Sequence, residues 1–190
     1  MEFTRPYRGQ DAHTVELFDR QWALPLVDVS ADTYIASNAH LVLGTTEFVE
    51  AAASALADRL AGPDVDYLVT PEAKSLPLTQ ALARELDVEY VVVRKSVKAY
   101  MHNPVTISVD SITTDEDQSL VLDGSDADRL AGARVALVDD AVSTGGTMDS
   151  LASLLDAVDA DVDVRAAVFA EGREHPDVET LATLPLFVAE

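Results

Sequence analysis

Hydrophobic and polar positions along the chain follow two alternating patterns, and each predicts a different kind of element. Short, nearly continuous apolar runs predict buried strands ending at about residue 44 and at 66–70, 89–93, 134–139, 164–170 and 186–188. Apolar residues at helical spacing predict helices between them, at about 45–60, 75–86, 125–130 and 147–158. This alternation predicts an α/β fold, a parallel sheet with helices on both faces.

One segment interrupts the alternation. Residues 95–118 are polar and rich in Ser, Thr and Asp. Within them Pro104 to Val109 alternates weakly, which predicts an edge strand or hairpin arm with Ser119 to Leu122 as its partner. A long excursion between two strong strands is typical of a functional loop. The chain shows no internal repeat or linker, so we expect a single domain over residues 1–190.

Composition narrows the chemistry. Apolar residues make up 48% of the 190 residues, and there is no cysteine, which excludes disulfides and thiolate catalysis. Any metal must therefore be held by oxygen or imidazole. Residues 1–10 lack the apolar core of a signal peptide, and no apolar run reaches the roughly 18 residues of a membrane span. We expect a cytoplasmic protein that does not contact membranes.

The net charge of -21 excludes most nucleic-acid partners, because such a surface repels phosphates. Acidic, lysine-poor composition is typical of salt-loving organisms, in which screening makes self-repulsion tolerable. The three lysines, Lys74, Lys95 and Lys98, fall in one short stretch together with Arg94. That clustering predicts an anion site, the alternative being chance grouping of a rare residue.

The stretch from Val135 to Met148, VALVDDAVSTGGTM, carries the strongest chemical signal. A strand leads into Asp139 and Asp140, then into a small-residue loop and an amphipathic helix. The loop offers close backbone approach, three hydroxyls and the N–H groups of a helix N-terminus, which together favour a phosphate. Its residues are Ser143, Thr144, Gly145, Gly146 and Thr147. The two carboxylates suit sugar hydroxyls or a hydrated Mg²⁺.

VALVDDAVSTGGT resembles the signature that binds 5-phosphoribosyl-1-pyrophosphate (PRPP) in the type I phosphoribosyltransferase family. The Walker-type phosphate loop does not fit, since no Gly-Lys-Ser/Thr follows. The likeness covers about residues 33–175 and implies the type I fold: a central, mostly parallel sheet flanked by helices. It further implies a small N-terminal hood or lid over about residues 1–44 and a mobile catalytic loop over about residues 95–118.

Thr70 to Ser75, TPEAKS, resembles the pyrophosphate-binding loop of the adenine and xanthine enzymes, which often carries a non-proline cis peptide. By that likeness Ala73, Lys74 and Ser75 bind pyrophosphate, although Ser75 stands where Gly is more usual. The segment 91–101 resembles the strand and loop in which those enzymes place Arg-Lys, so Arg94, Lys95 and Lys98 are implied to reach the same group. Thr113 departs from the adenine enzymes, which carry a Glu near this position.

The resemblance implies a reaction and its participants. A purine nitrogen attacks C1 of PRPP, with Asp139, Asp140 and Lys95 as the implied catalytic residues and Mg²⁺ held through the two aspartates and waters. Similar enzymes are usually homodimers, and no nucleic acid takes part. A PRPP-sensing regulator and a binding protein with an inactive site are the alternatives of other classes.

The choice of base depends on few residues. Glu171 and Gly172 follow a strand where xanthine enzymes carry a Lys, so we favour adenine, with hypoxanthine, guanine or xanthine as alternatives. Asn38 is a candidate to read the purine edge, or else a turn residue.

Overall fold

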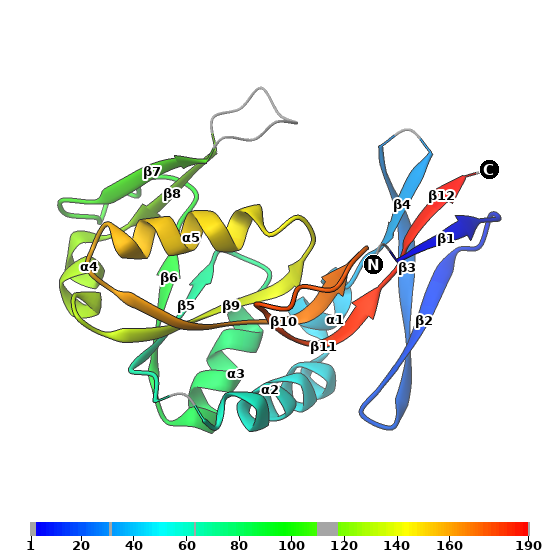
Figure 1. Cartoon of the computed structure of the whole chain (residues 1–190), viewed down its shortest axis with the longest axis horizontal. Helices are drawn as coiled ribbons and strands as arrows, with labels where there is room; N and C mark the ends of the chain where they lie inside the picture. Colours follow the sequence, from blue (N-terminus) through cyan, green and yellow to red (C-terminus); the bar gives the residue numbers. More distant parts are fainter. Residues whose placement is uncertain (1–2, 31, 63, 110–117, 190) are drawn as a thin grey trace.

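The computed structural model describes residues 3–30, 32–62, 64–109 and 118–189. Its centre is a five-stranded sheet in the order β11-β10-β9-β5-β6, in which every neighbouring pair is parallel (Figure 1). The strands are β5 (Tyr67–Pro71), β6 (Glu89–Val93), β9 (Arg134–Val142), β10 (Asp161–Glu171) and β11 (Glu179–Leu184). The parallel sheet and most of its strands are confirmed, whereas β11 was not predicted.

Helices cover both faces of this sheet. Helices α2 (Thr46–Leu60) and α3 (Leu76–Leu86) lie on one side, and α5 (Gly146–Asp156) lies on the other (Figure 1). The middle strand β9 sends Ala136 and Val138 into the core beneath α2 and α3, and Val135 and Leu137 into the core beneath α5. Burial on both faces explains why β9 is apolar without alternation.

A second five-stranded sheet lies at one end of the molecule and is called here the N-terminal sheet (Figure 1). Its order is β1-β12-β4-β3-β2, and β1 pairs in parallel with β12, so both ends of the chain meet in it. The strands are β1 (Thr4–Tyr7), β2 (Ala12–Leu17), β3 (Arg20–Ser30), β4 (Thr33–Ala36) and β12 (Leu186–Ala189). Phe18 and Trp22 pack edge-on against the fully buried Phe48 of α2, which joins this sheet to the core.

One local prediction was wrong. The run ending at Gly44 is a short helix, α1 (Ala39–Gly44), in which the amides of Leu41 and Val42 donate to the Asn38 carbonyl. A four-residue apolar run does not distinguish a strand from a buried helical turn by periodicity. Helix α4 (Gly124–Leu130) lies where a helix was predicted, and Asp123 is its N-cap residue. Ser125 donates its hydroxyl proton to Asp123.

The predicted hairpin is confirmed. Strands β7 (Val105–Val109) and β8 (Gln118–Leu122) pair antiparallel, and Leu120 and Leu122 pack in the core beneath α5. The expectations for a mobile loop and for Thr113 fall on residues 110–117, which lie outside the described residues. Within the described part of the chain, no helix combines the length and apolar character needed to cross a bilayer.

Candidate functional site

The predicted site residues gather at the carboxyl edge of the central sheet, where parallel α/β sheets bind ligands. Strand β9 carries Asp139 and Asp140 near its end, and the turn 143–147, which the sequence predicts to bind a phosphate, follows it. The TPEAKS loop follows β5, Arg94 follows β6, and Glu171 ends β10. Adjacent strands therefore deliver acidic and basic groups to one edge.

Asp140 is the centre of this arrangement. Its Oδ2 accepts a hydrogen bond from Lys74 Nζ at 2.7 Å and another from Asn38 Nδ2 at 2.9 Å. Lys74 Nζ also lies 3.4 Å from Asn38 Oδ1. Asp140 is 5% exposed, so this contact neutralises a carboxylate that has little access to water. One carboxylate thus connects the TPEAKS loop with the residue at which the N-terminal sheet joins α1.

Asp139 differs from its neighbour in protonation. Burial, together with the negative charge of Asp140, raises the pKa of Asp139 from 3.8 to about 7. The amide of Asp140 donates to Asp139 Oδ1 at 2.8 Å and opposes that rise. At a pH near 7 Asp139 is therefore about half protonated, unlike an ordinary aspartate.

The turn after β9 has the geometry of an anion site. Gly145 has a φ of +94°, a left-handed conformation that favours glycine, and it caps helix α5 at Gly146. The amide of Gly146 donates to Thr144 Oγ1 at 3.3 Å, and the side chains of Ser143 and Thr144 are exposed. The N-terminus of α5 and the turn's hydroxyls therefore face solvent, where a phosphate can reach them.

The TPEAKS loop has the conformation that the resemblance implies. The peptide between Glu72 and Ala73 is cis although no proline is present. Ser75 is buried, and its Oγ lies 2.8 Å from Thr70 Oγ1 and donates to the Pro71 carbonyl at 3.2 Å. Its φ is -80°, so the backbone here does not require the glycine that is more usual.

Glu72 was missed by sequence reasoning, although it organises the basic residues. Its carboxylate accepts from the Lys95 amide at 2.7 Å and forms ion pairs with Arg94 at 3.1 Å and Lys98 at 3.6 Å. Partial burial opposes ionisation of Glu72, but the Lys95 amide and the two cations outweigh it and lower its pKa. The available signal was its position, as the acid directly before the cis bond in TPEAKS.

Glu171 closes the site from β10. Burial raises the pKa of Glu171, the positive charge of Lys74 opposes the rise, and the negative charge of Asp140 adds to it. These influences place Glu171 in the same electrostatic environment as Asp140 and Lys74. In the sequence, this position differs from the xanthine enzymes only in lacking their lysine, which did not predict a role for the Glu171 carboxylate.

The donor set at this edge fits a metal that keeps most of its water. Among the described residues, no group of three or more His, Asp and Glu side chains could enclose an ion. Adjacent carboxylates with acceptor oxygens suit Mg²⁺, which is usually bound through one or two carboxylates plus substrate phosphates.

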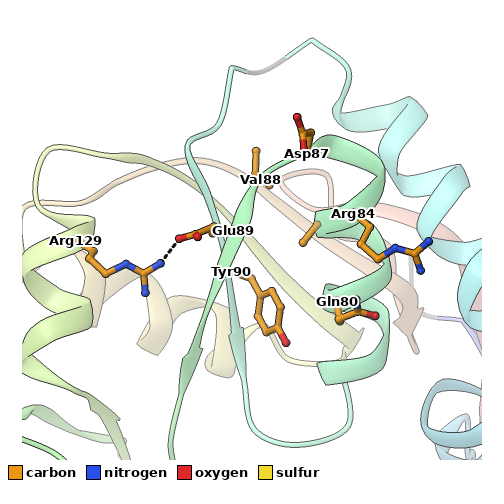
Figure 2. A pocket seen from close by; sticks show the side chains of 8 residues that line it. Gln80, Arg84, Asp87, Val88, Glu89, Tyr90 and Arg129 are labelled. Atoms are coloured by element: carbon orange, nitrogen blue, oxygen red, sulfur yellow. Dashed lines mark hydrogen bonds and ion pairs between the residues drawn. The ribbon is translucent and has the colours of Figure 1, made fainter.

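Another hollow lies away from this edge. A cavity of about 540 Å³ opens between the end of α3 and the edge strand β6 (Figure 2). Its basic side chains already have acidic partners: Arg129 pairs with Glu89 and Asp126, and Arg84 lies 3.7 Å from Glu50. None of the predicted site residues lines this cavity, so its position does not support a role in the same chemistry.

Known proteins resemble this chain in sequence and fold. The family model of the phosphoribosyl transferase domain matches residues 45–180. A relative named HGPRTase-like protein 3 from Haloterrigena turkmenica is 33% identical over 136 residues, which cover 71% of this chain and 69% of that protein. A probable purine biosynthesis transcriptional regulator, PurR, from Streptococcus pneumoniae is 32% identical over 58% of this chain and 40% of its own length.

The fold has a solved counterpart. Adenine phosphoribosyltransferase from Thermoanaerobacter pseudethanolicus superposes with a TM-score of 0.70 at 23% identity, covering 84% of this chain and 95% of that one. At that identity the likeness concerns the fold, and it agrees with the match to the domain family. The chain belongs to the type I phosphoribosyltransferase family.

Proposed function

We propose that the protein transfers the 5-phosphoribosyl group from PRPP to a purine base, giving a nucleoside 5′-monophosphate and pyrophosphate. The contact of Asp140 with Lys74 at 2.7 Å and with Asn38 at 2.9 Å carries this proposal. This contact joins Asp140, assigned to the ribose, with Lys74, assigned to the pyrophosphate, and with Asn38, the candidate to read the base. Such convergence is expected of a site that holds both substrates at once.

Each part of PRPP has a matching group. The turn 143–147 offers amides and hydroxyls to the 5′-phosphate, and Asp139 and Asp140 accept hydrogen bonds from the ribose hydroxyls. The pyrophosphate group would be bound by the backbone of 73–75 and by basic residues. Those basic residues are Lys74, Arg94, Lys95 and Lys98.

The chemistry requires no protein nucleophile. A bond forms between the purine nitrogen and C1, the C1–O bond breaks with its electrons passing to pyrophosphate, and the proton of the attacking nitrogen is released. Positive charge develops on the ribose ring and negative charge on the leaving group, so the Asp140 carboxylate and the ionised fraction of Asp139 stabilise the former and Lys95 the latter. A Mg²⁺ ion held through the two aspartates and waters would supply further neutralisation of the pyrophosphate.

We favour adenine as the base. A Glu171 carboxylate can accept a hydrogen bond from an exocyclic amino group, whereas a purine 6-oxo group offers no proton there. Asn38 stands at the same edge and could read the base once substrate displaces Asp140 from its amide. A 6-oxopurine is supported by the HGPRTase-like relative, so hypoxanthine, guanine and xanthine remain the alternative substrates.

A PRPP-sensing regulator is the second candidate, because relatives named PurR share this part of the chain. The net charge of -21 speaks against binding DNA with the present surface. We therefore expect an enzyme without a nucleic-acid partner. From the family resemblance we also expect it to be cytoplasmic and to act as a homodimer.

The test is a panel of adenine, hypoxanthine, guanine and xanthine, each incubated with PRPP and Mg²⁺ at high salt. Nucleotide is measured by chromatography. We expect AMP to form fastest with the wild type. In Glu171→Gln the rate advantage of adenine over the 6-oxopurines should become smaller, because the glutamine amide nitrogen can also donate to a 6-oxo group. Absence of any nucleotide, with PRPP still bound in calorimetry, would instead support the regulator.

A further inference from the structure

The connection after β10 reaches across to the phosphate-binding turn. Arg173 Nη2 donates to the Thr144 carbonyl at 2.6 Å, and Arg173 Nε donates to the Ser143 carbonyl at 3.3 Å. His175 Nε2 lies 2.7 Å from the same Ser143 carbonyl oxygen. A carbonyl oxygen only accepts, so Nε2 of His175 carries the proton in this contact. Two side chains therefore hold two successive carbonyls of the turn.

Holding these carbonyls also orients amide groups. In a trans peptide the C=O and the following N–H point in opposite directions across one rigid plane. Fixing the Ser143 and Thr144 oxygens on the side of Arg173 and His175 therefore directs the N–H groups of Thr144 and Gly145 to the opposite side. Amides directed in this way are the donors that an anion-binding turn needs.

The same contact supplies positive charge. The turn 143–147 contains no Lys or Arg, and the chain carries a net charge of -21. Asp149 lies in the first turn of α5, but its charge is compensated by Arg165 at 2.7 Å. Arg173 thus brings a cation to the turn through its carbonyls, which favours a dianionic phosphate nearby.

Gly172 fixes the position of the backbone directly before Arg173. Its φ is +72°, and a Cβ there would lie 2.8 Å from Leu186 side-chain atoms. Its amide donates to the Leu184 carbonyl at 2.8 Å, and its carbonyl accepts from Phe3 at 2.6 Å. The backbone before Arg173 is therefore anchored where β11 and the N-terminal sheet meet. The Arg173 side chain therefore extends to the turn from a fixed backbone position.

We propose that Arg173 and His175 are positioning residues that hold the turn 143–147 in the conformation that binds the sugar's phosphate. The proposal rests on the proposed function, since it assumes that this turn receives a phosphate monoester. They act through the backbone of the turn, so their removal should affect binding of the phosphoribosyl part more than the chemical step.

The experiment compares Arg173→Ala, Arg173→Lys and His175→Leu with Arg59→Ala as the matched control. Arg59 also donates to a backbone carbonyl, that of Thr180 at 2.6 Å, but not to the turn 143–147. Ribose 5-phosphate and pyrophosphate are titrated separately by calorimetry at constant salt. Steady-state rates give KM for PRPP and kcat, and thermal unfolding reports folding.

We expect Arg173→Ala to weaken ribose 5-phosphate binding and raise KM for PRPP by roughly tenfold or more, the scale of one charged hydrogen bond. Its kcat and its affinity for pyrophosphate should stay near those of the wild type. His175→Leu should show a smaller effect of the same kind. Arg173→Lys should recover part of the loss, because a lysine donates to one carbonyl without the planar fork.

Three outcomes overturn the inference. One is unchanged ribose 5-phosphate affinity in a folded Arg173→Ala protein. Another is an equal loss in Arg59→Ala, which would indicate a general effect of charge. A third is equal weakening of pyrophosphate and ribose 5-phosphate, which would indicate general unfolding of the site. If the wild-type protein itself binds neither PRPP nor ribose 5-phosphate, the proposed function fails, and this inference fails with it.

Discussion

The proton on Asp139 should make the stability of the folded protein depend on pH in a way that one substitution removes. Burial and the charge of Asp140 raise the pKa of Asp139 from 3.8 to about 7. Asn has the shape of a protonated aspartate and does not titrate. Asp139→Asn therefore mimics the protonated form at every pH and keeps the acceptor for the Asp140 amide.

The magnitude follows from the two pKa values. The difference between 3.8 and about 7, at about 1.36 kcal/mol for each unit, is on the order of 4 kcal/mol. Because the folded pKa is the higher one, the folded state binds the proton more tightly than the unfolded chain. The corresponding stability is complete below about pH 4 and is lost as the pH rises through about 7.

The assay is urea unfolding of the wild type and Asp139→Asn at constant high salt, over a series from about pH 4 to about pH 9. We expect the free energy of unfolding of the variant to exceed that of the wild type by an amount that grows with pH. The difference should be near zero at about pH 4 and on the order of 4 kcal/mol, or somewhat less after local relaxation, above about pH 7. Asp64→Asn is the control, since Asp64 has a side chain that is 88% exposed. Its curve should run parallel to that of the wild type.

Parallel curves for the wild type and Asp139→Asn would refute the reasoning. They would mean that Asp139 stays ionised in the folded protein and that water or counterions reach it despite its burial. A gain of equal size for Asp64→Asn would assign the effect to the overall negative charge instead of to the buried pair.

Two further substitutions test the assigned roles. Asp140→Asn should lower turnover by on the order of 100-fold, the scale for one preorganised charge contact. Unfolding in urea should show a stability near that of the wild type, because the asparagine oxygen can still accept from Lys74 or Asn38; near-wild-type turnover would contradict the assignment. Lys74→Ala should weaken binding of both PRPP and pyrophosphate in calorimetry, because it removes the cation of the TPEAKS loop, and unchanged affinities would mean that the lysines cluster by chance.

The sequence predicted the central sheet because its inner strands are buried on both faces. Glu89–Val93 and the run leading into Asp139 are apolar almost without interruption, and few environments other than a covered parallel sheet accept such runs. The site motif lay at the end of one such strand, so the order of the elements was enough to place the turn 143–147 at the sheet edge.

The N-terminal sheet was not predictable in the same way. Strands β1 and β12 have only 4 residues each, β1 is largely exposed, and the two pair from opposite ends of the chain. Local patterns carry no information on such a distant pairing, which depends on how the rest of the fold brings the ends together. Arg173 and His175 were missed for a related reason, because they contact the turn only through backbone carbonyls about thirty positions away.

The ion pairs of Glu72 have a consequence for turnover. If pyrophosphate occupies the cations Arg94 and Lys98, it must compete with a carboxylate that is already there. Glu72 then acts as an internal counterion that takes back those cations when the product leaves. Departure of a highly charged product would not expose bare positive charge, and the resting protein would give chloride and other small anions less to bind.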